Sequence, residues 1–180
     1  MSTQAISKWN IDAAHSEVQF KVKHLVISTV TGSFKKFSAS IEKHGESWAG
    51  SAIEFSADVT SIDTNQADRD GHLQSPEFFD AAQYPTIDFK STSFTEKSAG
   101  VYTVVGDLTI KGITKSVELT AEFGGSMVDP WGNHKVGFEV TGEIIRDEFG
   151  LTWSAVTEAG GLVVGPTVKL IMNVQFAPAQ

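Results

Sequence analysis

Cysteine is absent from this chain of 180 residues. Disulfides, thiolate metal sites and cysteine nucleophiles are therefore excluded, whereas the redox compartment stays undetermined. Arginine is scarce as well, because only two of the fourteen lysine and arginine residues are arginines, Arg69 and Arg146. Each arginine directly precedes an aspartate, so the two strongest hydrogen-bond donors of the chain each carry an adjacent anion.

Long apolar runs are also missing. No window approaches the roughly 18 uninterrupted apolar residues of a transmembrane helix, so we expect no transmembrane segment. The first eight residues lack the apolar core and the cleavage site of a signal peptide. We therefore expect a cytoplasmic location for the chain as written, or a periplasmic one if a signal peptide has been removed. The net charge of −8 disfavours nucleic acid and anionic lipid surfaces as main partners.

Familiar catalytic motifs do not occur. The chain has no G-x-S-x-G elbow, no P-loop, no H-E-x-x-H zinc motif and no G-x-G-x-x-G between a strand and a helix. Asp68 and His72 would share one face of a short helix, but two ligands in one local stretch are a weak metal signal. We expect no metal, no cofactor and no enzymatic activity, although a triad that assembles only in space leaves no local motif.

Strand-forming residues dominate the sequence. It has 12 Phe, 16 Gly and many Val, Thr and Ser residues, a composition that favours β structure. Apolar and polar residues alternate with a period of two in eight segments, which predicts eight strands with one apolar face each. These segments are residues 18–22, 34–41, 53–59, 87–89, 102–110, 117–123, 136–144 and 170–176.

Short turns such as Lys111-Gly112 join most of these segments, so the strands form a meander. A meander must close into a barrel or stack as a sandwich to bury its apolar faces. We expect an all-β fold in one domain, residues 1–180: an eight-stranded antiparallel barrel. A slip in the alternation at Lys35-Lys36 predicts a bulge.

One stretch departs from the strand pattern and predicts a short helical insertion at about residues 62–84. Asn65 is the expected N-cap of a helical segment that ends at Leu73. Ser75-Pro76 begins a second turn, with proline at the first helical position. We therefore expect residues 62–84 to be the one stretch of the chain without β structure.

Small residues recur on the predicted inner faces, at Ala39, Ala57, Gly106, Ala121 and Gly142. Since protein interiors tolerate few voids, either neighbouring large residues fill these positions or a ligand does. A filled barrel would be a structural protein that tolerates Gly142→Leu. A hollow barrel would have a wall of carbon atoms and would select a hydrocarbon guest.

Several polar residues could lie near the barrel mouth. His24 has inward parity at the end of its segment, which fits either a histidine at the core edge or a contact to a ligand head group. Arg69-Asp70 and Arg146-Asp147 either hold the insertion against the rim or form a cationic patch for a phosphate or carbonyl group. Both roles are compatible.

Several motifs, in order, resemble the YceI-like, polyisoprenoid-binding family over nearly the whole chain, from about Trp9 to Phe176. They are Trp9-x-x-Asp12-x-x-His15-Ser16, Phe20-x-Val22-x-His24, Gly32-x-Phe34-x-x-Phe37, Arg69-Asp70-x-His72-Leu73-x-Ser75-x-x-Phe78-Phe79-Asp80, Tyr84-Pro85 and Arg146-Asp147-x-Phe149-Gly150.

The resemblance implies a lipocalin-like barrel that holds a polyprenyl chain lengthwise, with its polar head near the mouth, and it suggests a homodimer. The head-group candidates that it implies are His24, Arg69, Asp70, His72 and Arg146. The tunnel wall that it implies is Phe20, Val22, Phe34, Phe37, Phe55, Phe89, Val104, Leu108, Leu119, Phe138, Val140, Leu170 and Met172.

With the resemblance, the leading hypothesis is a protein that binds a long-chain polyisoprenoid or an isoprenoid quinone for transport, storage or sequestration. Its partner would be this hydrophobic small molecule. The alternative is a lipid-modifying enzyme, a hydrolase or isomerase that uses His72 or His24 as a base on a prenyl substrate.

Overall fold

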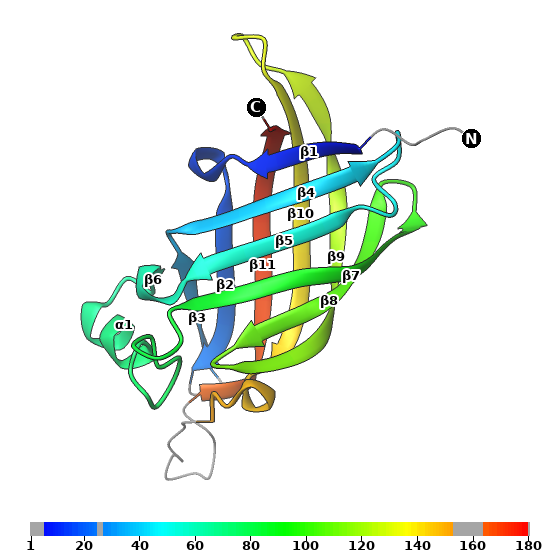
Figure 1. The fold of residues 1–180 in the computed structure, drawn as a ribbon. Helices are drawn as coiled ribbons and strands as arrows, with labels where there is room; N and C mark the ends of the chain where they lie inside the picture. The colour runs from blue at the N-terminus through cyan, green and yellow to red at the C-terminus, as the bar shows by residue number, and fades with distance from the viewer. Residues whose placement is uncertain (1–5, 25–26, 153–163, 180) are drawn as a thin grey trace.

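The computed structural model describes residues 6–24, 27–152 and 164–179, without the side chain of His24. The described strands form one antiparallel sheet that curls into a barrel (Figure 1). The strands are β1 (Ile6–Ile11), β2 (Glu17–His24), β3 (Ser28–Phe34), β4 (Phe37–His44), β5 (Ala52–Asp58), β6 (Ile62–Asp63), β7 (Thr86–Ser98), β8 (Val101–Ile110), β9 (Ile113–Val128), β10 (His134–Ile145) and β11 (Val164–Pro178). The helices are α1 (Ala67–Leu73) and three 3₁₀ turns, η1 (Ala13–His15), η2 (Val59–Ser61) and η3 (Arg146–Phe149).

Eight of these strands close the barrel. The hydrogen-bonded order is β1, β4, β5, β7, β8, β9, β10 and β11, and β11 pairs back with β1 through Trp9 opposite Pro178 and Ile11 opposite Phe176. This confirms the predicted eight-stranded antiparallel barrel. An eight-stranded ring has an interior that side chains can just fill, or that holds one small ligand.

The strands of the ring are not all those that the alternation predicted. β1 closes the ring but was not among the predicted strands. β2 pairs with residues Val164 to Asn173 of β11, next to the stretch of β11 that pairs with β1. On its other side β2 pairs with β3, and β3 pairs with β6, so these three strands lie outside the ring. Because β11 is 15 residues long, one of its edges accommodates both β1 and β2.

The predicted bulge at Lys35-Lys36 is instead a corner between two strands, because β3 ends at Phe34 and β4 begins at Phe37. The backbone at the corner bonds to the end of β5 and to the turn after it: Asp58 N donates to Lys36 O at 2.9 Å, and Lys35 N donates to Ser61 O at 3.1 Å. The chain therefore leaves the β2–β3 ribbon and enters the ring at this point.

The alternation is cleanest in β8, where Tyr102, Val104, Leu108 and Ile110 are buried. The following turn has positive φ at both residues, 52° at Lys111 and 76° at Gly112. Such two-residue turns match the twist of the paired strands. The register from Val101 opposite Glu122 to Ile110 opposite Ile113 is therefore continuous.

The predicted insertion is present, but its first two residues, Ile62 and Asp63, form β6 and pair with β3. The helix α1 lies at one end of the barrel beside β6 (Figure 1). Its N-cap is Gln66, whose side chain accepts a hydrogen bond from Arg69 N at 3.1 Å, and not Asn65, which has a φ of 69°. Ser75 to Phe79 form a turn that Phe78 N closes by donating to Ser75 O at 2.9 Å. Within the described residues, no helix is both long and apolar enough to cross a membrane.

Candidate ligand-binding cavity

The barrel encloses a cavity of about 210 Å³. A single buried water needs only about 10–15 Å³ in a comparable measure, so the space is much larger than a packing defect. Its lining is aliphatic and aromatic except for Gln19 and Arg146. Gln19 alternates along β2 with Val18 and Phe20, which face the cavity, so its amide belongs to the opposite face of the strand. Water has few polar partners here, which favours a hydrocarbon guest.

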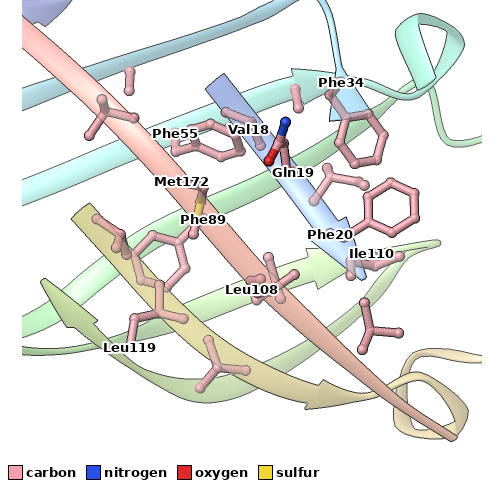
Figure 2. A pocket seen from close by; sticks show the side chains of 18 of the residues that line it. Val18, Gln19, Phe20, Phe34, Phe55, Phe89, Leu108, Ile110, Leu119 and Met172 are labelled. Atoms are coloured by element: carbon pink, nitrogen blue, oxygen red, sulfur yellow. The ribbon is translucent and has the colours of Figure 1, made fainter. Parts of the chain in front are cut away.

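Most of the predicted wall residues face this cavity, and Figure 2 shows several of them projecting from opposite strands into one space. Those that line it are Phe20, Val22, Phe34, Phe55, Phe89, Val104, Leu108, Leu119, Phe138, Val140, Leu170 and Met172. Phe37 does not line it. Its ring stacks on Phe55 with centroids 6.5 Å apart, so it supports the wall from the side.

Large and small residues share the inner faces in two different ways. The ring of Phe89 lies over Gly106, where an added Cβ would come within 2.5 Å of the ring, and the ring of Phe20 covers Gly32 in the same manner. These glycines let the rings lie flat against the sheet. Ala57 and Ala121 instead line the open space. Neighbouring rings thus fill the space at some of the small residues, whereas other small residues border open space, and the centre of the barrel is hollow.

An aromatic cluster closes one end of the cavity. Trp48, in the loop between β4 and β5, is 6% exposed and packs against Trp9, Phe123 and Phe138 with centroid distances of 5.5, 6.2 and 5.3 Å. Lys43 places its ammonium 4.5 Å from the Trp48 ring centre. Since Phe138 also lines the cavity, the space ends at this cluster.

The insertion covers the other end. Leu73, Phe78 and Phe79 reach from it into the cavity lining, and the Phe79 ring meets Phe34 at 6.2 Å. Lys111, in the β8–β9 turn, donates to Pro76 O at 2.9 Å and to Gly150 O at 3.4 Å. This ammonium therefore ties the insertion to the chain that follows η3.

Two of the head-group candidates, Arg69 and Asp70, bond within the insertion. Arg69 Nε donates to Thr64 Oγ1 at 2.7 Å and its Nη2 donates to Thr64 O at 2.6 Å. Asp70 Oδ1 accepts from Thr64 N at 2.8 Å and also from the Thr64 hydroxyl. Neither residue lines the cavity. Their side chains hold α1 against β6, which is the structural role that the sequence left open.

Arg146 lies at the cavity and is 4% exposed. Its guanidinium donates to three backbone carbonyls, those of Gly165 at 2.8 Å, Leu151 at 2.6 Å and Val164 at 3.1 Å. Burial lowers the pKa of Arg146, and the neighbouring Asp147 opposes this shift. The geometry makes Arg146 a clamp between η3 and the start of β11, as well as part of the wall.

His72 does not line the cavity but contacts it through a neighbour. Its Nε2 bonds to Glu77 Oε2, and its ring packs edge-on against Phe78 with centroids 5.1 Å apart. The imidazole is 37% exposed. The fifth candidate, His24, ends β2, and its side chain lies outside the described part of the structure. His72 therefore combines solvent access with a contact to a residue that lines the cavity.

Sequence reasoning missed several parts of the lining, among them Phe94, Leu151, Val164 and Val168. The apolar residues of the insertion, Leu73, Phe78 and Phe79, were quoted as a motif but not assigned to the wall, although apolar residues in a polar segment are a usable signal. Ile11 also lines the cavity, but it belongs to β1, whose alternation is weak. A cavity that has a carbon lining and an aromatic floor can hold an apolar molecule.

Comparisons with known proteins agree with this architecture. The family model of the YceI-like domain matches residues 9–176. A UPF0312 protein of Staphylococcus epidermidis is 37% identical over 175 residues, which cover 96% of this chain and 98% of the relative. Burkholderia cenocepacia BcnA has a TM-score of 0.80 at 24% identity, over 92% of this chain and 98% of that one.

A polyisoprenoid binding domain from Saccharophagus degradans, described as implicated in plant cell wall breakdown, has a TM-score of 0.69 at 18% identity. The match covers 95% of this chain and 98% of that domain. At these identities the two solved structures support the fold alone. The family model spans almost the full length, and the chain belongs to the YceI-like family.

Proposed function

We propose that this protein binds a long-chain polyisoprenoid or an isoprenoid quinone and keeps it from water during transport, storage or sequestration. The apolar tail would occupy the barrel cavity, and the polar head would stay at the end covered by the insertion. The observation that carries this proposal is the cavity itself, about 210 Å³ of space walled by carbon. The polyisoprenoid binding described for the Saccharophagus domain, which has the same fold, supports it.

Burial of the tail would supply most of the binding free energy. Each buried methylene contributes about 0.8 kcal/mol, so about ten buried methylene-sized groups contribute roughly 8 kcal/mol before the costs of association. This contribution requires no polar contact inside the cavity. The wall would therefore select for an apolar chain, and selection among head groups would take place at the rim.

The experiment is extraction of the purified protein with organic solvent, followed by mass spectrometry and by reloading of the emptied protein. We expect a prenyl lipid in near-stoichiometric amount, and saturable uptake of a prenol or a quinone afterwards. A protein that is repeatedly lipid-free and takes up neither compound would refute the proposal. The homodimer suggested by the family resemblance remains a prediction, which sedimentation analysis of the lipid-bound protein would test.

A lipid-modifying enzyme is the second candidate, and one observation favours it. The His72–Glu77 contact beside Phe78 pairs an imidazole with a carboxylate that could orient it as a general base. Among the described residues, the cavity wall next to it has no hydroxyl or carboxylate that could act as a nucleophile, which favours binding over catalysis. Turnover of a prenyl diphosphate that is lost in His72→Ala, while binding persists, would reverse this preference.

A further inference from the structure

The basic residues that bond at the insertion end of the barrel are engaged with the protein itself. Arg69 donates to Thr64, Arg146 donates to three backbone carbonyls, and Lys111 donates to two. Stretches of the sequence outside the described part add no lysine or arginine. A head group with an oxygen anion would therefore need another cation at this end of the cavity.

Lys115 has the position that such a cation requires. It pairs across the β8–β9 ladder with Leu108, which is 7% exposed and lines the cavity. Directly paired residues of an antiparallel ladder project from the same face of the sheet. The next residue of the same parity along β9 is Val117, which also lines the cavity. The side chain of Lys115 therefore projects from the inner face of the barrel wall.

The exposure of Lys115 places it at the rim. Leu108 beside it is buried, yet Lys115 is exposed, and its ammonium forms no hydrogen bond or ion pair with the described part of the chain. A lysine can lay its aliphatic stem along an apolar surface while its ammonium stays in water. By contrast, Lys21 and Lys23 alternate with Phe20 and Val22, so they project from the outer face.

We propose that Lys115 is the specificity-determining residue of the cavity mouth, which favours lipids whose head group carries an oxygen anion, a phosphate or a carboxylate. This inference rests on the proposed function and adds the chemistry of the head group to it. The pairing with Leu108 would place the ammonium beside the end of the cavity where an apolar tail enters. A charge contact at such an exposed position adds little binding free energy, but it distinguishes an anionic head group from a neutral one.

The test compares geranylgeranyl phosphate with geranylgeraniol, which share one tail and differ in the charge of the head. We expect Lys115→Met to weaken binding of the phosphate about two- to fivefold, the range of an exposed charge contact, and to leave the affinity for the alcohol unchanged. Lys115→Arg should restore the preference, and added salt should reduce it in the wild-type protein.

Lys169→Met is the matched control. Lys169 is exposed on β11 between Val168 and Leu170, which line the cavity, so its own side chain faces outward. This variant should bind both lipids as the wild type does. An equal loss of both lipids in Lys115→Met, or no loss of either, would overturn the role of Lys115. A wild-type protein that binds neither lipid would instead refute the proposed function itself.

Discussion

Filling the cavity from its wall should weaken binding of a prenyl lipid without unfolding the protein. Ala57 is 1% exposed, lies in β5 and lines the cavity. Ala57→Leu adds about three methylene-sized groups to the space and displaces a similar amount of lipid carbon. At about 0.8 kcal/mol per group, this costs roughly 2.4 kcal/mol of binding free energy, or about 50-fold in Kd. Titration of wild type and variant with the same prenol measures the difference.

Ala52→Leu is the matched control, because Ala52 lies in the same strand with the opposite parity and is exposed. We expect it to bind the prenol as the wild type does. The stability of Ala57→Leu is equally informative, since an added side chain costs about 1–3 kcal/mol where the core is already packed. If Ala57→Leu lowered the free energy of unfolding by that amount and left prenol binding intact, the cavity would not be the binding site.

Three further changes test other parts of the structure. Gly106→Ala should lower the free energy of unfolding by about 1–3 kcal/mol in urea titrations, because its Cβ would lie 2.6 Å from the backbone oxygen of Lys90 as well as against the Phe89 ring; an unchanged midpoint would contradict that packing. Hydrogen bonds from Lys135 and then from His15 lower the pKa of Asp12 from 3.8 to about 2. The stability that this lowered pKa contributes is present above about pH 4 and is lost as the pH falls through 2, by up to about 2 kcal/mol. Lys135→Met should reduce this loss in unfolding curves measured across that pH range. An equally steep loss in the variant would refute the role of Lys135. Arg146→Lys should lower the free energy of unfolding by more than about 1.5 kcal/mol, because a single ammonium cannot reproduce the geometry of three guanidinium hydrogen bonds. A variant that stays stable and loses only lipid binding would instead make Arg146 a head-group ligand.

The sequence was sufficient for the parts of the fold that depend on local alternation. β8 and β9 follow from their period-two pattern and from the Lys111-Gly112 turn, because a single register satisfies both. The closing strand β1 did not follow, since its place depends on pairing with residues 176–178 of β11 at the other end of the chain. Such long-range pairing has no local signal, so the closed barrel was predicted with one strand misassigned.

The candidate site likewise combines features that have a local sequence signal with features that have none. Alternation put most of the wall residues on the apolar faces of strands, because every second residue of a barrel strand faces inward, and the family resemblance assigned them to a cavity wall. It did not show how Arg69 and Arg146 are used, since their partners are Thr64 and backbone carbonyls that a sequence pattern does not reveal. Lys115 could have been found, because it interrupts the apolar face between Ile113 and Val117.

The affinity for a series of prenols that differ only in the number of isoprene units tests most directly whether the barrel holds a tail in a space of fixed length. The free energy of binding should become more favourable with each added unit, by an amount that reflects about 0.8 kcal/mol per buried methylene. It should then level off when the tail reaches the aromatic cluster around Trp48. An affinity that does not depend on chain length would show that the lipid binds by its head alone, outside the barrel.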